Sequence, residues 1–284
     1  MVRDLKLHLC VVALAAAFAS PPAFAADQVH DEIQVYNAEI GQWTYEQHLN
    51  FAAVGQTQPD VPGGFSSNHS LQGTPEFAYG ITDWWEGGFY IPFAVDGSGQ
   101  LLSDGAKIRS LFVVPDAAKR SFFYGVNFEL GYELPRFASS PWGLEIRPIV
   151  GVRNAQWEFI ANPIVDLSFG SGGEADFAPA LRLARNLGND WYVGLEYYGD
   201  FGKIGDFLPL QQQSQQLFAV TDFKAGVVDV ELGVGYGFTG GSDRLVAKAI
   251  IGYAFPVPGK GGNAAPKLGM GTSARSTQDP WSTK

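Results

Sequence analysis

Residues 42–53 read QWTYEQHLNFAA, and they divide into two chemically different sets when every second position is taken. The mostly apolar set is Trp43, Tyr45, Gln47, Leu49, Phe51 and Ala53, and the mostly polar set is Gln42, Thr44, Glu46, His48, Asn50 and Ala52. Side chains of a β-strand alternate between its two sides, so this pattern predicts a strand with one apolar face. The segment also has about the ~9–11 residues that a tilted strand needs to cross a bilayer core.

The same alternation recurs about a dozen times along the chain. We predict strands at residues 42–53, 67–81, 85–93, 106–114, 122–134, 142–152, 156–169, 174–184, 191–201, 214–223, 228–238 and 245–255. Within the seventh of these strands, Pro163 predicts a bulge or a local break, because proline cannot donate a ladder hydrogen bond. The tenth strand alternates least clearly, since residues 217–220 form a continuous apolar run.

Residues 1–25 have the order of a secretory signal peptide, with Arg3 and Lys6 first, an apolar run over residues 9–19, and Ala-Phe-Ala at residues 23–25. We expect cleavage after this last group. The alternative is a membrane anchor, but the apolar run is shorter than the ~20 residues that a spanning helix needs.

The composition of the remaining chain limits the classes of protein to which it can belong. No apolar run after the signal peptide is long enough for a transmembrane helix, so an exported chain of this kind is periplasmic, secreted or an outer-membrane β-barrel. The formal charge of −10 becomes about −11 after cleavage, which argues against nucleic acid as a partner. The single cysteine, Cys10, leaves with the signal peptide, so we expect no disulfide and no thiolate metal site.

The number of strands and the lengths of their connections predict the architecture. An even count of about twelve favours a closed antiparallel barrel with both termini on one side. The connections after even-numbered strands are mostly short and those after odd-numbered strands are mostly longer, as in outer-membrane barrels with short periplasmic turns. We therefore predict an all-β, single-domain, closed transmembrane β-barrel over residues 42–255, with a periplasmic lead-in at residues 26–41 and a disordered tail at residues 256–284.

Aromatic residues on the apolar faces gather near the strand ends. The predicted periplasmic girdle consists of Trp43, Tyr79, Trp85, Trp157, Trp191, Tyr253 and Phe255. A second set lies at the opposite strand ends and consists of Phe51, Phe93, Trp142, Phe169, Phe177 and Phe201. Amphipathic rings prefer the headgroup level of a bilayer, so two girdles separated by aliphatic residues indicate a lipid-facing surface. The alternative fold is a soluble β-sandwich or jelly roll, but such a core has no reason to order its aromatics by depth.

The chain resembles proteobacterial outer-membrane β-barrel proteins. Residues 75–86, PEFAYGITDWWE, are similar to the second hairpin of the uncharacterised barrel family named for the meta-pathway of phenol degradation, which implies an outer-membrane transporter. The last predicted strand, with Tyr253 and Phe255 two positions apart, is similar to the closing strand that the barrel-assembly machinery recognises. It differs from that pattern because residues 256–284 follow the last aromatic.

If the apolar faces meet lipid, the opposite faces line the lumen. The predicted lining is Glu46, His48, Glu76, Glu86, Lys107, Arg109, Glu129, Glu145, Arg147, Glu158, Asp166, Asp176, Arg182, Glu196, Asp200, Asp229, Glu231, Arg244 and Lys248. In an open, water-filled lumen the excess of carboxylates would favour cations over anions. In a packed interior the same groups would pair across the barrel and leave little passage, and the sequence leaves both readings open.

Enzymatic and metal-binding readings find less support in the sequence. Ser67 and His69 would share a strand face, but barrels resembling phospholipases and lipid A deacylases show the His before the Ser. His48 near Glu46 is more typical of a lumen pair than of a catalytic dyad. We find no cluster of His, Asp and Glu whose spacing indicates a metal site, and the glycines of residues 233–237 alternate with apolar residues as in a strand. We therefore expect no catalytic residue, no cofactor and no metal.

These observations predict a passive pore or small-molecule uptake channel of the outer membrane, with an acidic lumen. A lumen-filled barrel with a structural or surface-contact role is the second reading, and a lipid-modifying enzyme is the third. The expected partners are outer-membrane lipid, the barrel-assembly machinery during biogenesis, and a small-molecule or cation solute. The loops at residues 55–65 and 202–213 are expected to fold inward as constrictions.

Overall fold

A computed structural model describes residues 32–34, 38–59, 61–170 and 173–257 of the chain. The predicted signal peptide at residues 1–25 and residues 258–284 of the predicted tail lie outside the described residues. No helix in the described part of the chain is long and apolar enough to span a bilayer.

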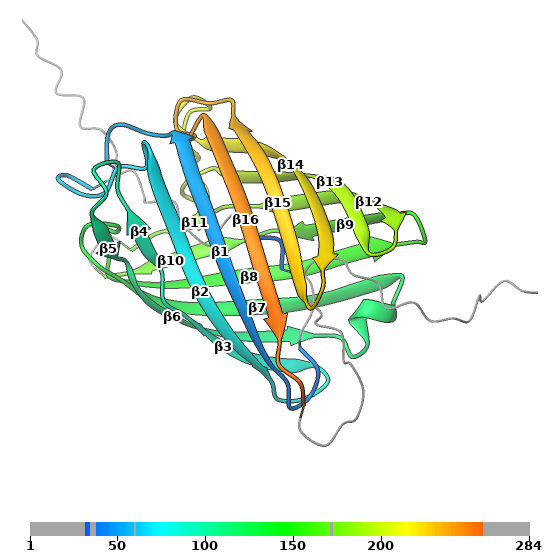
Figure 1. Ribbon diagram of the computed structural model, residues 1–284. Coiled ribbons are helices and arrows are strands. Elements are labelled where there is room, and N and C mark those ends of the chain that lie inside the picture. The colour runs from blue at the N-terminus through cyan, green and yellow to red at the C-terminus, as the bar shows by residue number, and fades with distance from the viewer. Residues whose placement is uncertain (1–31, 35–37, 60, 171–172, 258–284) are drawn as a thin grey trace, which may run out of the picture.

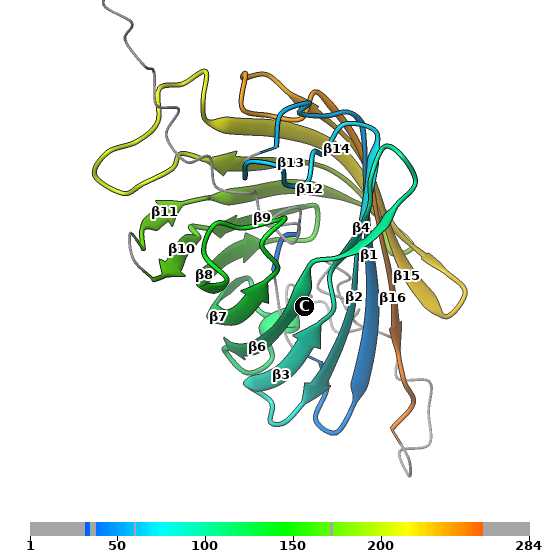
Figure 2. The same cartoon turned by 90° about the vertical axis from the view of Figure 1, so that its left-hand side faces the viewer.

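The described chain forms a closed antiparallel barrel (Figure 1), which confirms the predicted fold class. Its twelve wall strands are β1 (Trp43–Val54), β2 (Ser70–Gly80), β3 (Trp85–Tyr90), β6 (Gly105–Val113), β7 (Phe122–Glu133), β8 (Trp142–Arg153), β9 (Trp157–Asn162), β12 (Ala180–Gly188), β13 (Trp191–Asp200), β14 (Ser214–Ala225), β15 (Val228–Gly237) and β16 (Leu245–Ala254). Each strand pairs with its neighbours in the chain, and β1 closes the ring by pairing with both β2 and β16. Figure 2 shows the wall curving from β2 round to β9.

Four short strands extend this wall at the loop end. They are β4 (Phe93–Val95), β5 (Leu101–Ser103), β10 (Val165–Phe169) and β11 (Ala175–Phe177). Strands β9 and β10 both pair with β8, and the break between them contains Pro163, as predicted. Pro92 lies in the corresponding break between β3 and β4. Pro92 and Pro163 both lack the backbone N–H that a strand donates to its neighbour, which accounts for the two breaks.

The two ends of the barrel differ in their connections. At the end where β1 begins, which we call the turn end, β12 and β13 are joined by Asn189 and Asp190 alone. Both residues have positive φ, 53° and 59°, as the type I′ hairpin turn requires. A 3-10 helix, η1 (Ala117–Lys119), lies in the connection from β6 to β7 at this end. The opposite end, the loop end, carries longer connections such as residues 55–69 and 201–213.

The outer surface of the wall is apolar, and the inner surface mixes apolar and charged groups. On β15, Val234 and Tyr236 point outward and are 59% and 57% exposed. The residues that alternate with them along the strand are buried. All seven residues of the predicted girdle lie at the turn end, on the outer face of their strands or just beyond the last strand. Rings in this group contact one another, as between Trp43 and Tyr79, whose centroids are 5.0 Å apart.

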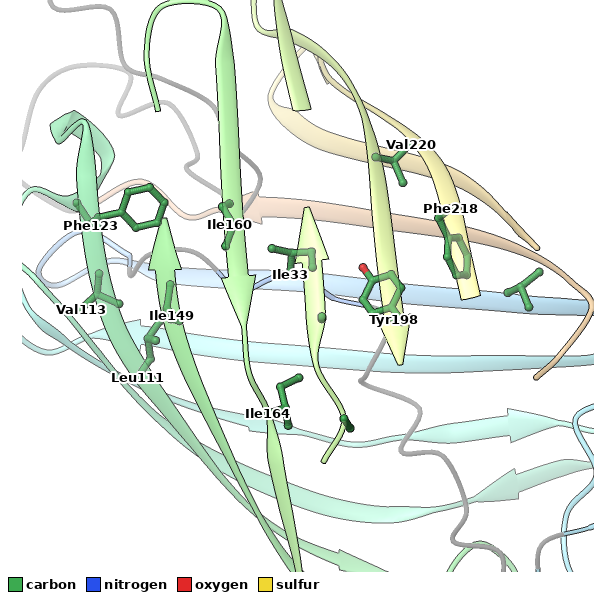
Figure 3. Packing of buried hydrophobic residues seen from close by; sticks show 14 of the residues in the cluster. Ile33, Leu111, Val113, Phe123, Ile149, Ile160, Ile164, Tyr198, Phe218 and Val220 are labelled. Atoms are coloured by element: carbon green, nitrogen blue, oxygen red, sulfur yellow. The ribbon is translucent and has the colours of Figure 1, made fainter. Parts of the chain in front are cut away.

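A piece of the N-terminal region lies inside the barrel rather than outside it. Residues 32–34, which we call the inner segment, place Ile33 in a buried cluster with Ile149, Ile160 and Tyr198 (Figure 3). The prediction of a periplasmic lead-in at residues 26–41 is therefore wrong for the inner segment. The physical reason is that the apolar inward-facing side chains of the wall bury Ile33, which an extended lead-in would leave in water.

Candidate functional site: the barrel interior

Most of the predicted lumen residues are buried within the wall. The buried ones are His48, Glu76, Glu86, Lys107, Arg109, Glu129, Glu145, Arg147, Glu158, Asp176, Arg182, Glu196, Asp229, Glu231 and Lys248. Glu46, Asp166 and Asp200 are half-buried. Arg244 is exposed and lies directly before β16, at the loop end of the barrel. Its guanidinium Nη1 donates to the carbonyl of Gly237, 3.1 Å away.

The inner segment is held by polar contacts to the wall. The backbone N–H of Gln34 donates to Asn162 Oδ1 (3.0 Å), and Asn162 Nδ2 donates back to the carbonyl of Gln34 (3.2 Å). Arg147 Nη1 donates to the carbonyl of Glu32 at 3.1 Å. Nearer the turn end, the N–H of Ala38 donates to a carboxylate oxygen of Glu86. The segment therefore satisfies its backbone groups with side chains from the far wall and occupies part of the lumen.

One ion-pair network lies on the side of the barrel formed by β2, β3 and β6. Arg109 Nη2 lies 2.5 Å from Glu76 Oε1 and 2.5 Å from Glu86 Oε1. Its guanidinium also sits 5.9 Å from the ring centroid of Tyr90, whose hydroxyl donates to Glu129 Oε1 at 3.1 Å. Buried charges are stable when they are paired in this way, so this part of the wall is a fixed structure rather than a solvated surface.

A second network joins five strands on the other side, from β12 to β16. Arg182 pairs with Glu196 and Asp222, and its Nη1 lies 3.5 Å from Glu231 Oε2. Lys248 pairs with Glu196 and lies 2.6 Å from Glu231 Oε1. These groups pair with one another between strands on one side of the wall.

Asp222 is a member of this network that the sequence did not indicate. It lies on β14, the strand whose apolar run obscured the alternation, and its inward neighbours Phe218 and Val220 are apolar. The sequence did contain a signal: Asp222 continues the spacing of two that places Phe218 and Val220 on the inner face.

A cavity of about 100 Å³ opens toward the loop end, between β7, β8, β10 and β11. Its lining includes the carboxylates of Glu129, Glu133, Glu145, Asp166, Asp176 and Asp200, together with Lys107. Asp166 faces Glu145 on one side and Asp176 on the other in the strand register. We call this cavity the acidic vestibule, because carboxylates outnumber the one lysine in its lining.

The two loops that are expected to constrict the lumen pack through aromatic side chains at the loop end. In residues 202–213, Ile204, Phe207 and Leu210 are exposed, with Phe207 packed against the rings of Phe177 and Phe201. In residues 55–65, Phe65 packs on Phe137 with ring centroids 5.0 Å apart.

The Ser and His of the enzymatic reading do not share a strand face. β2 begins at Ser70, so Ser67 and His69 belong to the preceding turn, where His69 has a φ of 57°. Ser67 Oγ donates to Asp243 Oδ1 at 2.5 Å, and His69 Nδ1 lies 2.8 Å from Asn68 Nδ2. This geometry directs the two side chains to different partners.

A third group, missed by the sequence analysis, lies midway along the barrel. Glu32 of the inner segment, Glu46 and His48 of β1, and Glu76 of β2 each present one ligand atom within 4.8 Å of the others. The expectation that no such cluster exists is wrong. Glu46 and His48 are two residues apart and therefore share the inner face of β1, which the sequence indicates. Glu76 joins them through the strand register, which places it opposite Glu46.

Comparison with known proteins finds similarity in the fold only. No family model matches the chain, and no curated protein matches it in sequence. An outer membrane channel from Pseudomonas putida F1 is similar in structure, with a TM-score of 0.57 and 10% identity over 79% of this chain and 99% of that one.

Two further structures match with TM-scores below 0.5. The translocator domain of the autotransporter NalP from Neisseria meningitidis gives a TM-score of 0.44 at 11% identity, over 78% of this chain and 90% of that one. LpxR from Salmonella typhimurium gives a TM-score of 0.39 at 10% identity, over 74% of this chain and 99% of that one. The likeness of fold is carried by the outer membrane channel, whose TM-score is 0.57.

Proposed function

We propose that this chain is an outer-membrane channel that admits small, positively charged or polar solutes by passive diffusion. Export through a cleaved signal peptide, insertion by the barrel-assembly machinery, and membership of the barrel family that residues 75–86 resemble are parts of this proposal. The closed wall, its apolar outer face and the ring of aromatics at the turn end support a place in a bilayer. The solved structure with a TM-score of 0.57 is described as an outer membrane channel, which supports the pore reading.

The proposal of a positively charged solute rests on the acidic vestibule. It opens at the loop end, which faces outward in a barrel whose termini are periplasmic. Its carboxylates outnumber its one lysine, Lys107, whose Nζ lies 3.6 Å from Glu133 Oε1. Such a mouth concentrates cations and repels anions before they reach the narrower interior.

A second function is supported by the interior itself. The inner segment and the two ion-pair networks place buried, paired groups inside the barrel. If this packing persists in the membrane, the barrel is a structural or surface-contact protein without transport.

Single-channel conductance distinguishes these two functions. The full chain, refolded in detergent and checked by a heat-modifiable gel band, is inserted into a planar bilayer under a KCl gradient. The channel function predicts a cation-selective reversal potential that moves toward zero in the double variant Asp166→Asn with Asp176→Asn. The matched control is Asp206→Asn in the exposed loop, which leaves the potential unchanged. Anion selectivity overturns the proposed solute class, and a folded barrel without current supports the structural function.

A further inference from the structure

The group formed by Glu32, Glu46, His48 and Glu76 combines one imidazole with three carboxylates at a single point of the interior. His48 and Glu76 are 5% and 2% exposed, and Glu32 is 5% exposed. Imidazole nitrogen and carboxylate oxygen together are the donors that Zn²⁺ and related divalent transition-metal ions take in proteins.

The spacing of these atoms suits coordination better than hydrogen bonding. His48 Nε2 lies 3.5 Å from Glu46 Oε2 and 3.6 Å from Glu76 Oε2. Direct N–H···O hydrogen bonds are about 2.7–3.2 Å long. Two donors on one tetrahedral Zn²⁺, each about 2.0–2.1 Å from the metal, are about 3.4 Å apart. The distances around His48 are therefore close to those of two ligands that share an ion.

Three of the atoms that point into this group have no hydrogen-bond partner in the described chain. They are Glu32 Oε2, His48 Nε2 and Glu76 Oε2. A buried polar atom without a hydrogen bond costs free energy, and the great majority of such atoms in folded proteins are paired. Three of them converging within one site indicate a missing partner that all three can bind.

The local charge balance also points to a cation. Arg109 contacts Glu76 through Oε1 and also contacts Glu86, which leaves Glu76 Oε2 directed at His48. Arg147 pairs with Glu145, and its Nη1 is 4.0 Å from Glu32 Oε2. With Glu46, five carboxylates in this region share these two guanidinium groups. A divalent ion offsets most of the remaining negative charge, whereas unpaired buried carboxylates are costly.

We propose that Glu32, Glu46, His48 and Glu76 bind one divalent transition-metal ion of the Zn²⁺ type. His48 supplies the nitrogen ligand, and each carboxylate supplies one oxygen. Because Glu32 belongs to the inner segment while the other ligands lie on β1 and β2, the ion fastens that segment to the wall. This site is separate from the acidic vestibule, and none of its four residues lines that cavity.

Cobalt is a suitable probe, because Co²⁺ replaces Zn²⁺ at such sites and absorbs visible light when it is coordinated. The untagged full chain, refolded in detergent, is titrated with CoCl₂ and then with ZnCl₂. We expect one Co²⁺ per chain with a visible absorption band that Zn²⁺ abolishes. His48→Gln should weaken binding by at least about ten-fold, since even the outer-shell partners of metal ligands contribute 10- to 100-fold to affinity. His69→Gln, at the exposed turn histidine near the loop end, should bind like the unmodified chain.

A variant outside the wall keeps the test decisive if His48→Gln fails to fold. Glu32→Gln lies outside every strand, so barrel folding, checked by the heat-modifiable gel band, should be retained. We expect the same loss of Co²⁺ affinity in this variant. Absence of a stoichiometric Co²⁺ band, or equal binding by the unmodified chain and a folded Glu32→Gln variant, overturns the proposal. Either result is independent of whether the barrel conducts.

Discussion

Arg147 on β8 donates a hydrogen bond of 3.1 Å from Nη1 to the backbone carbonyl of Glu32. The same guanidinium lies 2.5 Å from Glu145 through its Nε. Arg147 is fully buried, so it joins the wall to the inner segment without access to water.

Arg147→Met should destabilise the folded barrel by about 3–5 kcal/mol, because Glu145 and the Glu32 carbonyl then lose a buried cationic partner. The double variant with Glu145→Leu should recover most of this loss, since an apolar pair of similar volume replaces the ion pair. Urea-induced unfolding, followed by tryptophan fluorescence, measures both. Lys119→Ala, in the exposed pair with Asp116, is the control that should change little. Equal stability of Arg147→Met and the unmodified chain would show that the pair contributes nothing.

Leu195 tests whether the outer face meets lipid. It lies midway along β13, points outward and is 49% exposed. Leu195→Arg should cost about 2–4 kcal/mol of folding free energy in a bilayer, because a charge at the midplane must be desolvated. Leu210→Arg, in the loop between β13 and β14, should cost little. Refolding yield and urea titration in lipid vesicles give the difference, and normal folding of Leu195→Arg would exclude a lipid-facing surface there.

Asn162 tests what keeps the inner segment in place. Asn162→Leu removes both hydrogen bonds to Gln34, each worth about 0.5–1.5 kcal/mol. With Ile33→Cys as a reporter on a Cys10→Ala background, maleimide labelling should become roughly ten-fold faster or more, because the segment leaves the interior more often. Gln216→Leu, on the distant strand β14, serves as the control. A labelling rate that Asn162→Leu leaves unchanged would mean that other contacts hold the segment.

Gly151 tests the packing of the inner face. A Cβ added at this position would lie 2.0 Å from Cζ of Phe123, its register partner on β7. Gly151→Ala should therefore cost about 1–3 kcal/mol, since the buried ring must move. Gly143→Ala on the same strand meets its nearest atom at 3.5 Å and is the matched control. Thermal unfolding of the two variants should separate them clearly, and equal midpoints would mean that Phe123 relaxes without cost.

The wall of the barrel was predictable because alternation is a local property of the chain. Each strand carries its own pattern, and the structure confirms twelve wall strands and the break at Pro163. The start of β2 was placed three residues early, at residue 67, because polar turn residues continue the alternation by chance. The two-residue turn at Asn189 and Asp190 needs no more than its sequence to be recognised.

The arrangement of the interior was not predictable in the same way. Alternation assigns a side chain to the inner face, but pairing depends on which inner residues meet across the ring. Glu46 and Glu76 become neighbours through the strand register, and Glu32 joins them from a segment with no strong pattern. The inward position of residues 32–34 depends on an interior that exists only after the ring has closed.

The inner segment has a mechanical consequence for the barrel. Glu32 reaches Glu46, His48 and Glu76 on the side of β1 and β2, while Arg147 and Asn162 hold the same segment on β8 and β9, about halfway round the ring. The segment thus acts as a crossbar along a diameter. A hollow ring of strands held by lateral hydrogen bonds can flatten into an oval under lateral membrane pressure, and this crossbar fixes the separation of two opposite walls. The cross-section of the barrel is therefore braced from within.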